Sequence, residues 1–196
     1  MMTDQSIDLN ADLGEFSGLE SKGADDAMLA LVSSANIACG GHAGNHETMF
    51  YALSTAAQRG VVVGAHPGYA DREGFGRRAI SMSHAEIGRM IAAQIGALQA
   101  VARLVPVKVR YVKVHGALAN LAACDGDVAA TVVDAVQGVS EELAILAISG
   151  TEIESAARAA GAPVFSEVFA DRGYQPNGQL VPRDRLGAMI HDPYEA

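Results

Sequence analysis

The 196-residue sequence predicts an α/β fold built on a parallel sheet, and two observations lead to that prediction. First, six short apolar segments alternate with longer segments whose apolar residues recur at helical spacing. Second, the connections are long enough for right-handed helical crossovers, which join parallel strands. Periodicity does not report whether a sheet closes, so the residues alone leave both a doubly wound sheet and a β/α barrel open.

The expected strands are residues 7–13, 35–41, 60–66, 109–115, 143–149 and 163–170. Most of them are nearly continuous apolar runs, as in strands that are buried on both faces. The first is different, because alternation places Asp8, Asn10 and Asp12 on one face. That face is either wetted by solvent or lines a site.

The expected helices are residues 24–34, 47–59, 83–104, 126–137 and 151–161. The third has the clearest apolar stripe, and Ser83 with Glu86 forms the capping-box pattern at its start. Thr151 and Glu154 repeat that pattern, and Gly161 is expected just after the last helix, where a left-handed residue usually ends a helix.

Composition limits the classes of protein to consider. The chain is 49% hydrophobic and 19% charged, which is typical of a globular protein, and its length favours a single domain over residues 1–196. A net charge of −9 with no basic cluster argues against nucleic acid as a partner. The two cysteines form no disulfide framework, and neither a membrane span nor a signal peptide is evident. We therefore expect a cytoplasmic protein.

Polar residues of catalytic type follow five of the six expected strands. In parallel α/β folds such groups meet at the carboxyl ends of the strands. They are Asp8, Asn10, Asp12, Glu15, Asn36, Cys39, His42, His66, Lys113, His115, Glu167, Asp171 and Arg172. Carboxylates can activate water, and Lys and His can stabilise negative charge, so the pattern favours acid–base hydrolysis at one shared site.

Several of these residues also have structural interpretations. His42 either belongs to the site or caps a turn, and with His46 it has the spacing of two metal ligands on a helix, although the usual intervening Glu is missing. Arg77 and Arg78 are either solvated or clamp a substrate carboxylate, and Cys39 is expected to be a small buried residue. The sequence contains no P-loop, dinucleotide-binding or serine-hydrolase motif.

Six segments together carry a family resemblance. They are "DLNADLGE", "NIACGGHAG", "GAHPGYADREGFGRR", "VKVHGALAN", "EVFADRGY" and "LVPR", and they occur in this order between residues 7 and 190. The chain resembles the LamB/YcsF family of 5-oxoprolinase A subunits. The resemblance implies a β/α barrel similar to that of polysaccharide deacetylases. It also implies ATP-dependent opening of 5-oxo-L-proline to L-glutamate together with B and C subunits, with ATP consumed on those partners.

In that hypothesis the chain performs the hydrolytic half of the reaction. Asp12, helped by Asp8, would orient or deprotonate water, while Lys113 and His115 would stabilise an oxyanion or phosphate. The full set of expected catalytic residues is Asp8, Asn10, Asp12, His42, His66, Lys113, His115, Glu167 and Asp171. The expected substrate-binding residues are Asn36, Arg78 and Arg172.

The resemblance also implies that the family continues beyond the segment matched here, with a further strand and helix. We therefore expect an irregular barrel that lacks its last βα unit, roughly 30 to 50 residues, with open strand edges that favour self-association. Two alternatives remain open. One is a metal-dependent, deacetylase-like hydrolase of a carbohydrate amide, and the other is a non-catalytic structural or regulatory subunit. The sequence does not decide whether a metal is bound.

Overall fold

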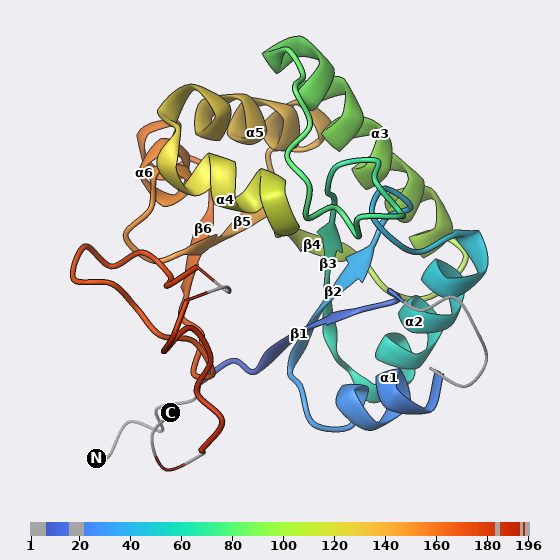
Figure 1. The fold of residues 1–196 in the computed structure, drawn as a ribbon. Coiled ribbons are helices and arrows are strands. Elements are labelled where there is room, and N and C mark those ends of the chain that lie inside the picture. The colour runs from blue at the N-terminus through green and yellow to red at the C-terminus, as the bar shows by residue number, and fades with distance from the viewer. Residues whose placement is uncertain (1–6, 16–21, 183–184, 193, 195–196) are drawn as a thin grey trace, which may run out of the picture.

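A computed structural model describes residues 7–15, 22–182, 185–192 and 194, and its strands form one parallel sheet. The strands are β1 (Asn10–Leu13), β2 (Ser34–Ala38), β3 (Val62–His66), β4 (Val109–Val112), β5 (Ala144–Ile148) and β6 (Val164–Glu167). They pair in chain order, and among the described residues β1 and β6 are the edge strands. The sheet curves as part of a β/α barrel (Figure 1), which confirms the predicted fold class.

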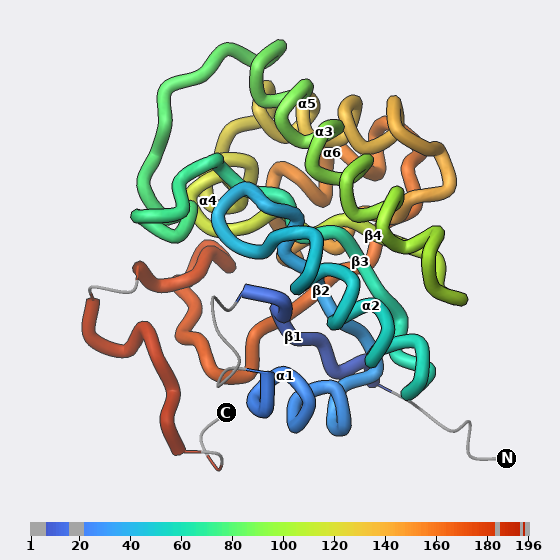
Figure 2. The backbone as a smooth tube through the Cα atoms, turned by 90° about the vertical axis from the view of Figure 1, so that its right-hand side faces the viewer, coloured from blue at the N-terminus to red at the C-terminus, as the bar shows by residue number. Residues whose placement is uncertain are grey.

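The helices are α1 (Lys22–Leu29), α2 (His46–Arg59), α3 (His84–Ala102), α4 (Gly116–Cys124), α5 (Gly126–Val139) and α6 (Glu152–Ala159). The helices α1, α2, α3, α5 and α6 form an arc outside the sheet, whereas α4 follows β4 directly and packs against α5 and α6 (Figures 1 and 2). Helix α4 was not expected from the sequence, because its run of Ala and Leu has weak helical periodicity. None of the described helices combines the length and the apolar character that spanning a lipid bilayer requires.

One of the two predicted capping boxes is confirmed. The Ser83 side chain accepts from the backbone N–H of Glu86, and the Glu86 carboxylate accepts from the backbone N–H of Ser83. The prediction at Thr151 and Glu154 is wrong. The Thr151 hydroxyl donates to the carbonyl of Ile148 (2.6 Å) instead, and the Glu154 carboxylate accepts from the backbone of the turn before α6.

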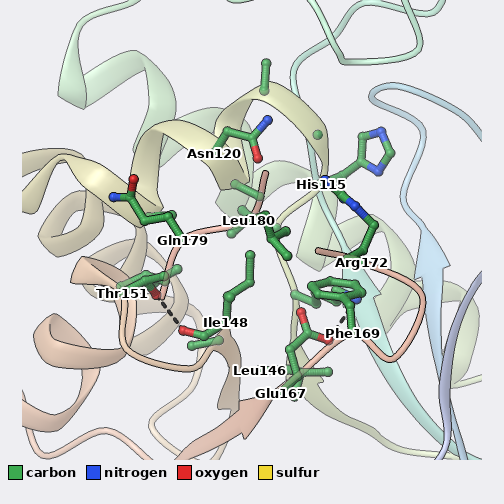
Figure 3. A pocket seen from close by; sticks show the side chains of 18 of the residues that line it. His115, Asn120, Leu146, Ile148, Thr151, Glu167, Phe169, Arg172, Gln179 and Leu180 are labelled. Carbon is green, nitrogen blue, oxygen red and sulfur yellow. Dashed lines mark hydrogen bonds and ion pairs between the residues drawn. The ribbon is translucent and has the colours of Figure 1, made fainter. Parts of the chain in front are cut away.

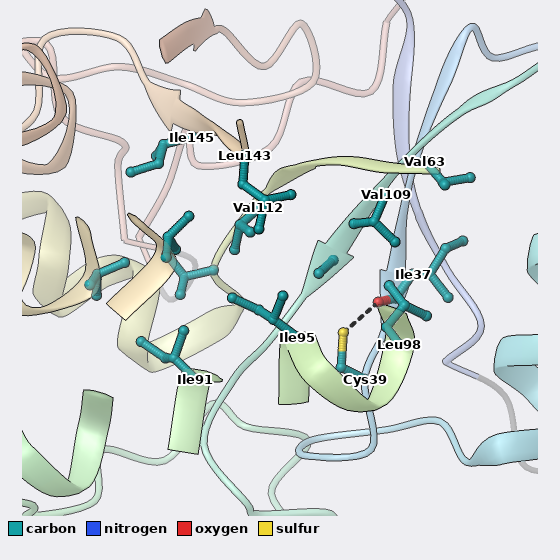
Figure 4. Close-up of a cluster of buried hydrophobic side chains, with 14 of the residues drawn as sticks. Ile37, Cys39, Val63, Ile91, Ile95, Leu98, Val109, Val112, Leu143 and Ile145 are labelled. Atoms are coloured by element: carbon teal, nitrogen blue, oxygen red, sulfur yellow. Dashed lines mark hydrogen bonds between the residues drawn. The ribbon is translucent and has the colours of Figure 1, made fainter. Parts of the chain in front are cut away.

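The hydrophobic core lies between the sheet and the arc of helices (Figure 4). Its centre includes Ile37, Val63, Val112, Ile91, Ile95 and Leu98. Cys39 belongs to this core, as predicted, and its thiol donates to the carbonyl of Ile37 (3.1 Å). Burial raises the pKa of Cys39 to about 12, so the thiol stays protonated and unreactive.

The concave face of the sheet is polar. The Asn10 amide donates to the hydroxyls of Ser34 (2.7 Å) and Tyr111 (2.9 Å), and Asn36 donates to the amide oxygen of Asn10. The polar face of β1 therefore points into the concavity. Tyr111 reaches Asn10 by lying across Gly64, where a Cβ atom would overlap the tyrosine ring. Glycine is required there because the ring approaches the backbone so closely.

We expect Gly64→Ala to destabilise the protein by roughly 1–3 kcal/mol, because the added methyl group overpacks against the Tyr111 ring. In a Tyr111→Ala background the same substitution should cost much less, because the ring is gone. Urea unfolding of the wild type, the two single variants and the double variant measures this coupling. An equal cost in both backgrounds would show that the close approach is not what requires glycine.

Candidate functional site

A pocket of about 660 Å³ opens at the carboxyl ends of the strands. Its polar floor consists of Asp12, Glu15, His66, Lys113, His115 and Glu167. Asn120 of α4, Phe169 and Gln179 contribute to its walls (Figure 3). The structure thus brings together five of the predicted catalytic residues and adds wall residues from α4 and from the irregular segment after β6.

Lys113 is the central cation of the floor. Its ammonium lies 3.0 Å from Glu167 Oε2 and 3.5 Å from Asp12 Oδ1, and its side chain is only 11% exposed. Burial raises the pKa of Glu167, although the Lys113 charge acts in the opposite direction. A lysine held between two carboxylates in a poorly hydrated position exerts a strong field on any group that enters the pocket.

Asp12 is held in its ionised form. Burial alone would raise its pKa, but attraction to His66 and Lys113 outweighs burial, and the net pKa lies well below its usual range. Reciprocally, burial lowers the pKa of His66, but Asp12, with Oδ2 at 3.5 Å from Nε2, raises it above its usual value. A carboxylate with so low a pKa is a weak base. The geometry therefore favours Asp12 as an orienting group over deprotonation of water.

Two backbone carbonyls determine the tautomers of His66 and His115. His66 Nδ1 lies 2.7 Å from the carbonyl oxygen of Lys113, and His115 Nε2 lies 2.9 Å from that of Phe75. Because a carbonyl only accepts, both of these ring nitrogens carry hydrogen. The opposite nitrogens, His66 Nε2 and His115 Nδ1, then face each other at 3.0 Å. If both rings were neutral, these two nitrogens would direct lone pairs at each other and repel. A positive charge between the two nitrogens would remove this repulsion.

Glu15 lies where three imidazole rings meet. Its Oε1 atom is 2.8 Å from His42 Nε2, 3.6 Å from His115 Nδ1 and 3.8 Å from His66 Nε2. The His42 ring stacks on the His115 ring, with centroids 3.6 Å apart. Burial lowers the pKa of His42 and, together with the neighbouring rings, lowers the pKa of His115 to about 4. Glu15 was not among the expected catalytic residues.

The loop that carries Phe75 is held by an ion pair outside the pocket. Arg78 donates to the carboxylate of Asp71, and this hydrogen bond holds the pKa of Asp71 at about 2. Arg78, one of the two predicted substrate-binding arginines, is therefore occupied within its own loop. Its neighbour Arg77 lines the pocket instead, with its guanidinium 5.1 Å from the centre of the Phe75 ring.

Three predicted residues lie on the concave face but outside the pocket lining. Asp8 accepts from the hydroxyls of Ser33 and Ser34 (2.6 Å each), before β1 begins. Asn10 and Asn36 bond to each other, and Asn36 also donates to the carboxylate of Asp12 (2.7 Å). Asn36 thus supports the site through Asp12, while Asp8 is remote from it.

The remaining predicted residues divide between the pocket and the surface. Arg172 lines the pocket, and its guanidinium donates to the carbonyl of Val181 (2.8 Å), which braces the segment that closes one side. Asp171 is exposed and outside the pocket lining. His46 is exposed beside Glu47 at the start of α2, so it does not join His42 as a second ligand. The final arginine of "LVPR" lies outside the described residues.

Comparison with known proteins agrees with the resemblance. Residues 7–196 match the LamB/YcsF family. A 5-oxoprolinase A subunit from Chloroflexus aggregans is 50% identical over 188 residues, which cover 96% of this chain and 75% of the relative. The corresponding protein from Azorhizobium caulinodans is 49% identical over 191 residues, which cover 97% of this chain and 76% of the relative.

Among solved structures, the lactam utilization protein from Thermus thermophilus matches with a TM-score of 0.92 and 41% sequence identity. The match covers 97% of this chain and 77% of that protein. Both the sequence and the fold match these relatives along almost the whole chain, and the chain belongs to the LamB/YcsF family.

Proposed function

We propose that this chain is the hydrolytic A subunit of an ATP-dependent 5-oxoprolinase that opens 5-oxo-L-proline to L-glutamate with B and C partner subunits. The observation that carries the proposal is the buried Lys113 between Glu167 and Asp12 at the floor of the pocket. The substrate class comes from relatives about half identical to this chain, which are named as A subunits of 5-oxoprolinase.

The chemistry explains why ATP is needed. A five-membered lactam is a stable amide, and phosphorylation of its carbonyl oxygen on the partner subunits makes the ring carbon electrophilic. Water adds to that carbon, the C–N bond breaks as the nitrogen gains a proton, and an acyl phosphate remains. A second water releases phosphate. The products are one glutamate, one ADP and one phosphate for each ATP and two waters consumed.

Three residues of the floor suit these steps. Glu167 has a raised pKa because it is buried, so it is a better base than Asp12 for the attacking water. The proton that it takes up can pass to the ring nitrogen as the C–N bond breaks. Lys113 stabilises the negative charge that develops on oxygen, and Asp12 holds Lys113 in position.

The pocket also has groups for the rest of the substrate. The Arg77 side chain lines the pocket and has no hydrogen bond or ion pair with the described residues, so it is available to the substrate carboxylate. Leu146 and Ile148 of β5 form an apolar wall that suits the ring methylenes (Figure 3).

Glutamate release tests the proposal. The assay contains 5-oxoproline, ATP and the B and C subunits, with and without this chain. Release that requires both the chain and ATP supports the proposal. A folded chain that binds the partners but adds no release would contradict it and would favour a non-catalytic role.

A second candidate is a metal-dependent hydrolase of a carbohydrate amide, and the cluster of Glu15 with three histidines favours it. Such an enzyme would release acetate from an N-acetylated sugar without ATP. Acetate release without partners, combined with no ATP-dependent glutamate release, would replace the first candidate with this one.

We expect Glu167→Gln to lower kcat for glutamate release about 100-fold to 10,000-fold, because the general base is lost. Glutamine keeps an oxygen that can accept from Lys113, so the fold should persist. Glu142→Gln is the matched control, since Glu142 pairs with Lys108 (2.6 Å) at the surface. Thermal unfolding and steady-state kinetics of both variants provide the comparison. A wild-type kcat in the Glu167→Gln protein would contradict the role of Glu167 as the general base.

Arg77→Gln and Arg78→Gln should have different effects although the residues are adjacent. For Arg77→Gln we expect KM for 5-oxoproline to rise about 10-fold to 100-fold with little change in kcat, because a charge-assisted contact to the carboxylate is lost. For Arg78→Gln we expect a lower Tm, because the loop loses its ion pairs with Asp71 and Glu73. Kinetics and thermal unfolding separate the two, and an unchanged KM for Arg77→Gln would contradict the assignment.

A further inference from the structure

The ligand atoms of Glu15, His66 and His115 surround a space of the size of a metal ion. Their separations are 3.0 Å between the two imidazole nitrogens, 3.6 Å from His115 Nδ1 to Glu15 Oε1, and 3.8 Å from His66 Nε2 to Glu15 Oε1. A triangle with these sides fits a circle of about 2.0 Å radius, which matches zinc–nitrogen and zinc–oxygen distances of about 2.0–2.2 Å. We infer that these three residues bind one divalent transition-metal ion.

The hydrogen bonds of the two rings prepare them for this role. The carbonyls of Lys113 and Phe75 hold the outer N–H groups, so the inner nitrogens present lone pairs to the shared space. Metal-bound histidines almost always donate their second N–H in this way, and the bond sets both tautomer and ring orientation. A cation between the rings also removes the repulsion of two lone pairs at 3.0 Å.

His42 supports the carboxylate from outside the triangle. Its Nε2 atom lies 2.8 Å from Glu15 Oε1, and the four ligand atoms lie within 4.8 Å of one another. Glu15, His66 and His115 line the pocket, whereas His42 does not. An ion on the three ligands would therefore face the pocket with a coordination position open to water or substrate, which is the arrangement of catalytic rather than structural zinc sites.

The donor set indicates which cation would bind. Two imidazole nitrogens and one carboxylate oxygen suit first-row transition metals such as Zn²⁺, Co²⁺ or Fe²⁺, whereas Mg²⁺ and Ca²⁺ prefer sites made of oxygen atoms. The inference rests on the geometry of the cluster alone and does not depend on the proposed function.

Titration calorimetry of the chelator-treated chain with ZnCl₂ tests the inference, and CoCl₂ adds a visible absorption spectrum that reports the ligand geometry. We expect one ion per chain and no comparable binding of MgCl₂. Glu15→Gln and His115→Gln should each weaken Zn²⁺ affinity at least 10-fold to 100-fold, the loss that follows even from removing a residue that only orients a ligand. His46→Gln is the matched control, because His46 is exposed and outside the cluster.

Thermal unfolding without metal checks that each variant is folded. Glu15 is partly exposed beyond the end of β1, so we expect Glu15→Gln to fold. This variant still tests the inference if His115→Gln does not fold. Absence of Zn²⁺ binding, or Zn²⁺ affinity unchanged by Glu15→Gln, would overturn the inference, as would an equal loss in His46→Gln. These titrations contain no 5-oxoproline, ATP or partner protein, so their failure leaves the outcome of the glutamate assay untouched.

Discussion

Two backbone carbonyls, those of Lys113 and Phe75, orient the histidines on which the whole site depends. The first is placed by the sheet, because the Lys113 N–H still donates to Ala65 on β3 (2.9 Å) just beyond β4. The second is placed by a loop in which Phe75 has a φ of 54°, a left-handed conformation that costs a non-glycine residue on the order of 1–3 kcal/mol. The Asp71–Arg78 ion pair helps to hold that loop. The site therefore combines a rigid sheet with a strained loop.

The sequence predicts much of this arrangement because strand alternation is a strong physical signal. Residues two apart on a strand share a face, so Lys113 and His115 had to point the same way. The convergence of parallel strands then placed them near residues that end other strands, among them Asp12, His66 and Glu167. The six predicted strands all exist, although each is only four or five residues long.

The positions that the sequence did not predict have equally physical causes. Asp8 shares a face with Asp12 but lies four residues earlier, about 13 Å along an extended chain. Alternation therefore predicted the face of the sheet on which Asp8 lies, but not its distance from the pocket. Glu15 was expected at the shared site but not as a catalytic residue. Gly14 has a φ of 73°, and this left-handed turn ends the alternation, so no strand pattern indicates that Glu15 faces the histidines. Arg77 and Arg78 lie in a loop, where side chains follow no regular alternation. Only the fold shows that Arg77 faces the pocket while Arg78 holds the loop.

His66 and His115 turn unprotonated nitrogens toward one shared space. Nitrogen-15 NMR of the imidazole rings tests it most directly, in metal-free protein at a pH above the pKa of both rings. We expect opposite tautomers, with the hydrogen on Nδ1 of His66 and on Nε2 of His115. Finding the same tautomer in both rings would contradict it, because one ring would then turn its N–H into the shared space and lose its carbonyl partner.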